Sequence, residues 1–104
     1  MADYLVPPCD AARRFTPEPM KLPTDQVDSE DWDVGRLSPR DRSIATLAAL
    51  TVLHRPEQLP AHLKDGIANG LTIEEISALI THIAFYGGFP AAIAASKIAA
   101  DTLL

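Results

Sequence analysis

Two histidines, His62 and His82, have the residue type and the helical position best suited to acid–base chemistry in this chain. At about 100° of rotation per residue, His62 lies about 60° from Leu59, at the border of an apolar helix face. His82 lies about 60° from Leu79 in the same way. A half-buried imidazole titrates near neutral pH and can transfer a proton. Histidines at such borders also serve simply as packing residues, and both interpretations stay open here.

Four further side chains are candidates for binding a substrate beside these histidines. Tyr86 follows His82 by four residues, so their polar tips share one helix face. Ser43 lies in an otherwise apolar segment, and no Gly-x-Ser-x-Gly elbow surrounds it, which argues against a hydrolase nucleophile. The cations nearest these groups in sequence are Arg40, Arg42 and Arg55, and any one of them could be an ordinary solvated charge. Arg42 adjoins Ser43 and could hold a carboxylate through paired hydrogen bonds, and Arg55 is kept as a further binding candidate.

Metal and thiol chemistry are not indicated by the composition. The chain has one cysteine, Cys9, so neither an intramolecular disulfide nor a cysteine-rich metal site can form within it. The three histidines fall on separate predicted segments without a paired ligand. We therefore expect no metal and no cofactor, and the single cysteine is consistent with a reducing cytoplasm.

The elements that position these side chains are predicted to be helices, because no segment alternates with period two. Ser38 and Thr72 are N-cap residues, whereas Gly70 and the Gly87–Gly88 pair are stop signals. The predicted helices cover residues 38–53, 58–69, 72–87 and 91–102. The run 43–53 carries no charge, which predicts that its helix is surrounded by protein. The predicted core faces contain Leu59, Leu63, Gly66 and Ile67 on the second helix, and Ile73, Ile76, Leu79, Ile80 and Ile83 on the third.

Residues 1–36 differ in composition from residues 37–104. They contain five of the nine prolines and most of the net negative charge. Helix interiors tolerate neither prolines nor unpaired acidic runs well. The sequence therefore predicts a largely irregular N-terminal arm, followed by a helical domain over 37–104. Short helical turns are expected around Cys9–Arg14 and Ser29–Trp32, with Trp32 as an anchor.

Net charge, length and hydrophobic content limit the classes of partner that the chain is expected to bind. A formal charge of −5 without a basic stripe argues against nucleic acid. The N-terminal sequence lacks a signal-peptide pattern, and the uncharged run 43–53 is too short to span a membrane. A chain of 104 residues that is 47% hydrophobic has a modest core, which favours self-association. We expect a cytoplasmic oligomer that binds a small molecule.

Three ordered segments carry a family resemblance: LSPRDRSIATLAAL at 37–50, HLKDGIANGLTIEEI at 62–76 and THIAFYGGFPAAIAA at 81–95. Together they resemble the carboxymuconolactone decarboxylase family, which belongs to a superfamily with the alkylhydroperoxidase AhpD. The resemblance covers roughly residues 37–102. It implies an all-α, AhpD-like helical domain that assembles into rings, commonly trimers or hexamers.

The peroxidase branch of that superfamily carries Cys-x-x-Cys with a histidine four residues later. His62 matches the histidine, while Arg55 and Gln58 occupy the cysteine positions, and Ser43 aligns with a glutamate of that branch. Dithiol chemistry needs one thiolate to attack and a second thiol to resolve the product. The resemblance therefore disfavours a thiol peroxidase.

The decarboxylase branch includes an enzyme of aromatic catabolism that acts on a lactone dicarboxylate. Such a reaction needs a cation for the carboxylates, an apolar wall and a general acid. The resemblance suggests His62 as the acid and Arg42 as the carboxylate clamp. The full candidate site contains His62 and His82 as catalytic groups, with Arg42, Ser43, Arg55 and Tyr86 as substrate-binding groups. The alternatives are a non-redox binding module and a structural oligomer on the same scaffold.

Overall fold

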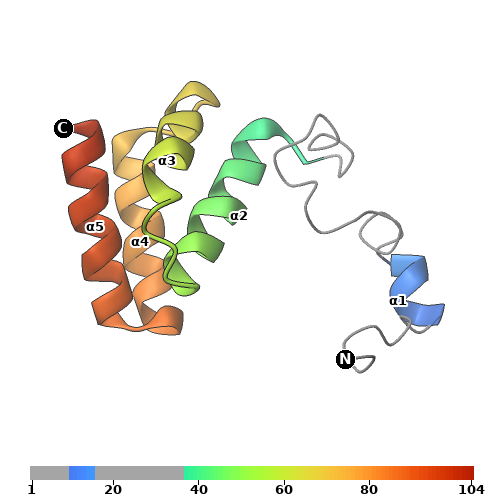
Figure 1. The fold of residues 1–104 in the computed structure, drawn as a ribbon. Coiled ribbons are helices and arrows are strands. Elements are labelled where there is room, and N and C mark those ends of the chain that lie inside the picture. Colours follow the sequence, from blue (N-terminus) through green and yellow to red (C-terminus); the bar gives the residue numbers. More distant parts are fainter. Residues whose placement is uncertain (1–9, 16–36) are drawn as a thin grey trace. The chain divides into compact units, whose positions relative to one another are not determined.

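The computed structural model describes residues 10–15 and 37–104, which fall in two units, 1–36 and 37–104. In the first unit, α1 spans Asp10–Phe15, at the position of one predicted helical turn (Figure 1). The predictions for Cys9, Ser29–Trp32 and the remaining arm lie outside the described residues.

The second unit consists of four helices, which are α2 (Pro39–Val52), α3 (Leu59–Ala68), α4 (Ile73–Gly87) and α5 (Phe89–Leu103) (Figure 1). The described residues contain no strand, so the predicted all-α fold is confirmed. α2 packs against α3 and α4, and α5 packs against the same two helices. No helix among the described residues combines the length and apolar character needed to cross a bilayer.

The core lies where the buried faces of these four helices meet. Leu47 of α2, Leu63 of α3 and Ile76 of α4 are 1–2% exposed. The last helix contributes small side chains, Ala92 and Ala95, to the same cluster. Small side chains allow α5 to lie close to its neighbours, so that the core is closely packed although the chain is short.

Both predicted N-caps are present. The Ser38 hydroxyl accepts a hydrogen bond from the backbone N–H of Asp41 at 3.0 Å. The Thr72 hydroxyl accepts from the backbone N–H of Glu75, and the Glu75 carboxylate accepts from the backbone N–H of Thr72, both at 3.0 Å. These bonds satisfy N–H groups that have no partner inside a helix, and so they fix where α2 and α4 begin.

The C-terminal ends of α2 and α3 share one backbone motif. After α2, the N–H groups of His54 and Arg55 donate to the carbonyls of Thr51 and Leu50, at 3.3 and 3.0 Å. After α3, the N–H groups of Gly70 and Leu71 donate to the carbonyls of Ile67 and Gly66, at 3.1 and 2.9 Å. This is the Schellman pattern, whose pivotal residue has a positive φ and is usually glycine. Gly70 fits this rule at φ 108°, whereas His54 occupies the position at φ 56°.

Two sequence predictions about burial were wrong. Ile67 is 38% exposed because the tight contact of Gly66 with α2 turns Ile67 toward the edge of α3. Ile73 is 43% exposed, since it lies in the first turn of α4 beside an apolar surface hollow. Ala45 and Ala49 of α2 are exposed within the described residues of one chain, so the statement that protein surrounds this helix stays a prediction.

Candidate functional site

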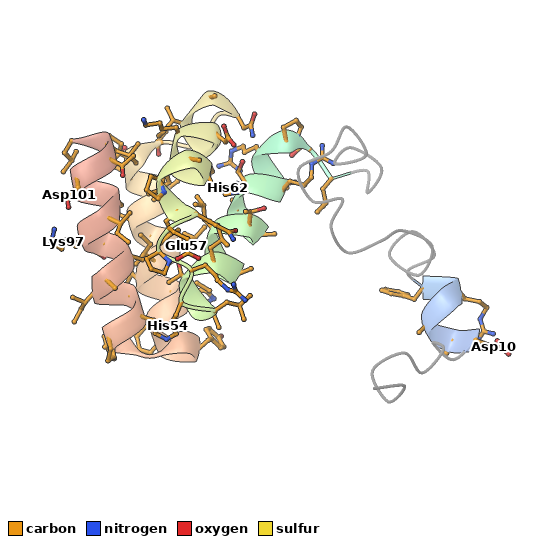
Figure 2. All side chains as sticks on the ribbon, viewed as in Figure 1. Asp10, His54, Glu57, His62, Lys97 and Asp101 are labelled. Atoms are coloured by element: carbon orange, nitrogen blue, oxygen red, sulfur yellow. The ribbon has the colours of Figure 1, made fainter. Side chains whose placement is uncertain are left out.

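His62 lies on α3 with 21% of its side chain exposed (Figure 2). Its Nδ1 atom is 4.0 Å from the Oδ2 atom of Asp65, one helical turn further along. That separation is too long for a hydrogen bond, and it gives an ion pair only when the imidazole is protonated. The half-buried border position that the sequence predicted for His62 is therefore confirmed, and its neighbour on α3 is a carboxylate.

Ser43 is buried between α2 and the end of α3. It is 7% exposed, and its hydroxyl oxygen accepts a hydrogen bond from the side-chain amide of Asn69 at 2.9 Å. Gly66 lies beside it, and a Cβ built on Gly66 would lie 3.8 Å from the Ser43 Cβ. The Ser43 hydroxyl thus joins two helices at a close contact. Arg42, the preceding residue, is partly buried on α2.

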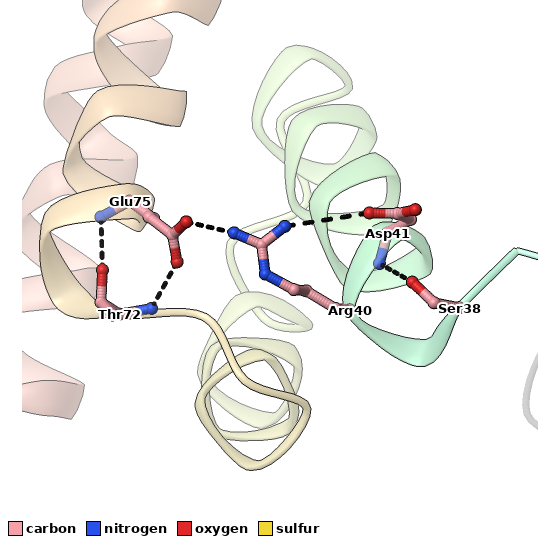
Figure 3. Close-up of polar contacts among 5 residues, drawn as sticks. All are labelled: Ser38, Arg40, Asp41, Thr72 and Glu75. Carbon is pink, nitrogen blue, oxygen red and sulfur yellow. Dashed lines mark hydrogen bonds and ion pairs between the residues drawn. The ribbon is translucent and has the colours of Figure 1, made fainter.

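A polar contact between α2 and α4 involves Arg40, one of the three cations that lie near the candidate residues in sequence. Its guanidinium forms an ion pair with the Glu75 carboxylate of α4, and its Nη1 atom lies 3.9 Å from the Asp41 carboxylate (Figure 3). The backbone N–H of Thr72 lowers the pKa of the Glu75 carboxyl, and the Arg40 charge lowers that pKa further. Glu75 therefore both caps α4 and holds the guanidinium in place.

A groove of about 320 Å³ lies between α2 and α4. Arg40 and Glu75 line one part of it, His82 lines another, and apolar side chains such as Ile44 and Leu79 lie among them. His82 follows Glu75 by seven residues on α4, or roughly 10 Å along the helix axis. The groove therefore combines a guanidinium, an imidazole and an apolar wall.

His82 is exposed, so the half-buried position predicted for it by analogy with His62 is wrong, but its ring contacts Tyr86 as the spacing predicted. Their ring centroids are 5.1 Å apart, and the ring planes are tilted by 49°. Tyr86 is 72% exposed and is not among the residues that line the groove. Tyr86 therefore supports the His82 ring from its outer side.

Arg55 lies in a different place from both candidate histidines. Together with His54 it lines a second hollow, of about 170 Å³, between the α2–α3 loop and α5. His62 is not among the lining residues of this hollow or of the α2–α4 groove. The predicted site residues therefore do not share one of these two hollows: His82 lines the α2–α4 groove, Arg55 lines the second hollow, and His62 and Ser43 line neither.

Comparison with known proteins shows which family the chain belongs to. A model of the carboxymuconolactone decarboxylase family matches residues 17–101. The chain belongs to this family. Among curated proteins, the 4-carboxymuconolactone decarboxylase of Acinetobacter baylyi is 38% identical over 72 residues, which is 69% of this chain and 54% of that protein. The chain therefore spans about half the length of the curated relative that it matches.

The match to the carboxymuconolactone decarboxylase family covers more of the chain than the three sequence segments did. The family match begins at residue 17, within the arm, rather than at residue 37 where the resemblance was drawn from sequence blocks. Candidate residues His62 and His82 both lie inside the match. The all-α, AhpD-like character of the helical unit agrees with the fold that this family implies.

The structure adds three residues that sequence reasoning did not place in a site, namely Arg40, Glu75 and Asn69. Arg40, Ile44 and Ala48 recur every four residues, so the sequence did contain a signal that they share one helix face. Glu75 follows the predicted N-cap Thr72 by three residues, which is the spacing of a capping box, and Asn69 is the last residue of the predicted helix 58–69. No group of three or more His, Cys, Asp or Glu side chains among residues 10–15 and 37–104 is arranged to hold a metal ion.

Proposed function

We propose that this member of the family is a cofactor-independent lyase that removes carbon dioxide from a small carboxylated lactone. The support is family membership, the activity named for the Acinetobacter relative and the α2–α4 groove. The observation that carries the proposal is the pairing of the Arg40 guanidinium and the His82 imidazole on one apolar groove. These groups supply the cation, the acid and the wall that such a decarboxylation needs.

The proposed reaction assigns one role to each part of the groove. The Arg40 guanidinium binds a substrate carboxylate that is retained, while the carboxylate to be lost lies against the apolar wall. The bond between that carboxylate and its carbon breaks, carbon dioxide leaves, and the electron pair stays on the lactone as an enolate. Protonated His82 donates a proton to that carbon, and water returns a proton to the imidazole. The apolar wall favours the loss of the carboxylate charge.

Glu75 shapes how strongly the guanidinium can bind a substrate. Its carboxylate occupies part of the Arg40 donor fork, but a guanidinium has five N–H donors, so others stay available. In this arrangement Glu75 orients the Arg40 side chain and also offsets part of its charge. A Glu75→Gln variant should therefore bind a dicarboxylate substrate more tightly and lower KM, because one competing negative charge is gone.

Turnover of 4-carboxymuconolactone, followed by its ultraviolet absorbance, tests the proposal directly. His82→Ala is expected to lower kcat by about 10²–10⁴-fold, the usual contribution of a general acid. Arg40→Gln should chiefly raise KM, and Arg42→Gln is its matched control on the same helix. Absence of turnover at high enzyme concentration would reject the lyase. Full turnover in His82→Ala together with its loss in His62→Ala would move the acid to α3.

We also propose that the protein self-associates through the corner where α4 meets α5. Phe85, Tyr86, Phe89 and Ile93 lie there and are 60–74% exposed, and the Phe85 and Phe89 rings meet edge to face at 5.9 Å. Monomeric proteins rarely leave large contiguous apolar patches uncovered. Because Tyr86 also contacts His82, this corner adjoins the proposed groove.

Light scattering on the purified protein measures this assembly. The wild type should have the mass of an oligomer, trimer or hexamer as the family resemblance implies, and a Phe85→Ser, Phe89→Ser double variant should shift toward monomer. A monomeric wild type would reject self-association. An intact oligomer without lactone turnover would instead favour the alternative of a binding or structural protein on the same scaffold.

A further inference from the structure

The hollow between the α2–α3 loop and α5 has the features of a second binding site. Its floor is apolar and consists of buried side chains, including Leu50, Leu59 and Ala95. Its basic side chains, a guanidinium and an imidazole, come from two consecutive residues, Arg55 and His54. It shares no lining residue with the α2–α4 groove, so it is a separate place on the molecule.

The loop that supplies these two side chains is held in an unfavourable conformation. His54 has φ 56° at the position where a Schellman motif favours glycine, and Gly70 occupies the equivalent position after α3. A residue with a Cβ is disfavoured there. The backbone N–H groups of His54 and Arg55 donate hydrogen bonds to α2. These bonds fix the backbone conformation of the loop at the two residues whose side chains line the hollow.

Charge and size define the ligand that fits this hollow. Within the described residues, the side chains that line it include no carboxylate, and the Thr51 hydroxyl already donates to the Leu47 carbonyl at 2.8 Å. The volume is about 170 Å³, and an apolar cavity of about 150 Å³ can hold one benzene ring. An apolar floor of this size beside a guanidinium is complementary to a single carboxylate on a compact apolar body.

We propose that this hollow binds a small monocarboxylate, with its apolar body on the floor and its carboxylate held by Arg55 and His54. The site shares no lining residue with the proposed catalytic groove, and its proposed ligand carries a single carboxylate. Binding here therefore does not depend on lyase activity, and either proposal can fail while the other stands.

Nuclear magnetic resonance titration of the full-length, ¹⁵N-labelled chain with benzoate tests the site. Benzoate should shift the amide resonances of residues 50–59 and 91–98 saturably, and benzyl alcohol, the neutral analogue, should bind more weakly. Arg55→Gln is expected to weaken benzoate binding by about tenfold, the size of one charge-assisted hydrogen bond. Arg55 is exposed, so this variant should fold normally.

Two matched variants keep the result interpretable. Arg40→Gln removes a guanidinium from the other groove and should leave the benzoate shifts at residues 50–59 unchanged. His54→Gly removes the imidazole while relieving the positive φ, so it should weaken benzoate binding and raise Tm. Equal benzoate affinity in wild type and Arg55→Gln would overturn the proposal. So would a titration without saturable shifts, or shifts centred on the α2–α4 groove.

Discussion

Replacing His54 with glycine is expected to stabilise the fold, although the change removes a whole side chain. His54 ends α2 at φ 56°, and its N–H and that of Arg55 close the last turn of the helix. In that conformation a Cβ approaches the carbonyl oxygen of the same residue, which costs about 1–2 kcal/mol. Glycine has no Cβ and avoids this cost. The His54 side chain is exposed, so little packing is lost in exchange.

The size of the effect follows from two opposing terms. Removal of the Cβ relieves about 1–2 kcal/mol, while glycine adds about 0.5–1 kcal/mol of conformational entropy to the unfolded chain. The net gain is about 0.5–1 kcal/mol in the free energy of unfolding. For a helical unit of this size, that gain corresponds to a rise in Tm of about 2–8 °C.

Thermal unfolding followed by circular dichroism at one fixed protein concentration measures the change. His54→Ala is the first control, because it removes the imidazole and keeps the Cβ, and its stability should stay within about 0.5 kcal/mol of wild type. Gly70→Ala is the reciprocal control at φ 108°. A Cβ there would meet only the Arg40 Cδ atom at 3.9 Å, so its cost of about 1–2 kcal/mol arises from the backbone.

The outcome pattern separates backbone strain from side-chain effects. If His54→Gly and His54→Ala lowered Tm equally, the imidazole would be a stabilising contact and the strain argument would be wrong. A stabilised His54→Gly variant with a destabilised Gly70→Ala variant would show that the two helix ends obey one rule. Histidine would then occupy its position at a cost, which is the pattern expected of a residue kept for function.

Three further predictions concern the helix contacts around the site. Gly66→Ala should destabilise the fold by about 1–3 kcal/mol in chemical denaturation, since its Cβ would lie 3.2 Å from a leucine carbon in the loop after α3. Because the backbone N–H of Thr72 lowers the pKa of Glu75 from 4.5, the stability that this carboxylate contributes is complete above its unfolded pKa and is lost as pH falls through the lower folded value. Tm should therefore fall in acid, and less steeply in Glu75→Gln. Ser43→Ala should cost about 1 kcal/mol by removing the acceptor for Asn69, and it should leave lactone turnover unchanged.

Features of the fold that depend on neighbouring residues were predictable from the sequence. The caps at Ser38 and Thr72 and the stop at Gly70 each involve groups within a few residues of one another, so residue type and spacing suffice. The pairing of Arg40 with Glu75 joins residues 35 positions apart, and it depends on how α2 packs on α4. The positive φ of His54 carried no sequence signal, because histidine is not the residue that usually marks such a turn.

The choice between His62 and His82 shows what packing adds to a helical pattern. Both were predicted at similar angles from a leucine, so the sequence treated them alike. Gly66 then brings α3 so close to α2 that a Cβ on it would lie 3.4 Å from the Leu47 side chain. Between α2 and α4, by contrast, the small side chain of Ala48 lies across a groove of about 320 Å³ that His82 also lines. A substrate needs space beside the acid, and for this reason we propose the imidazole on α4 as the acid.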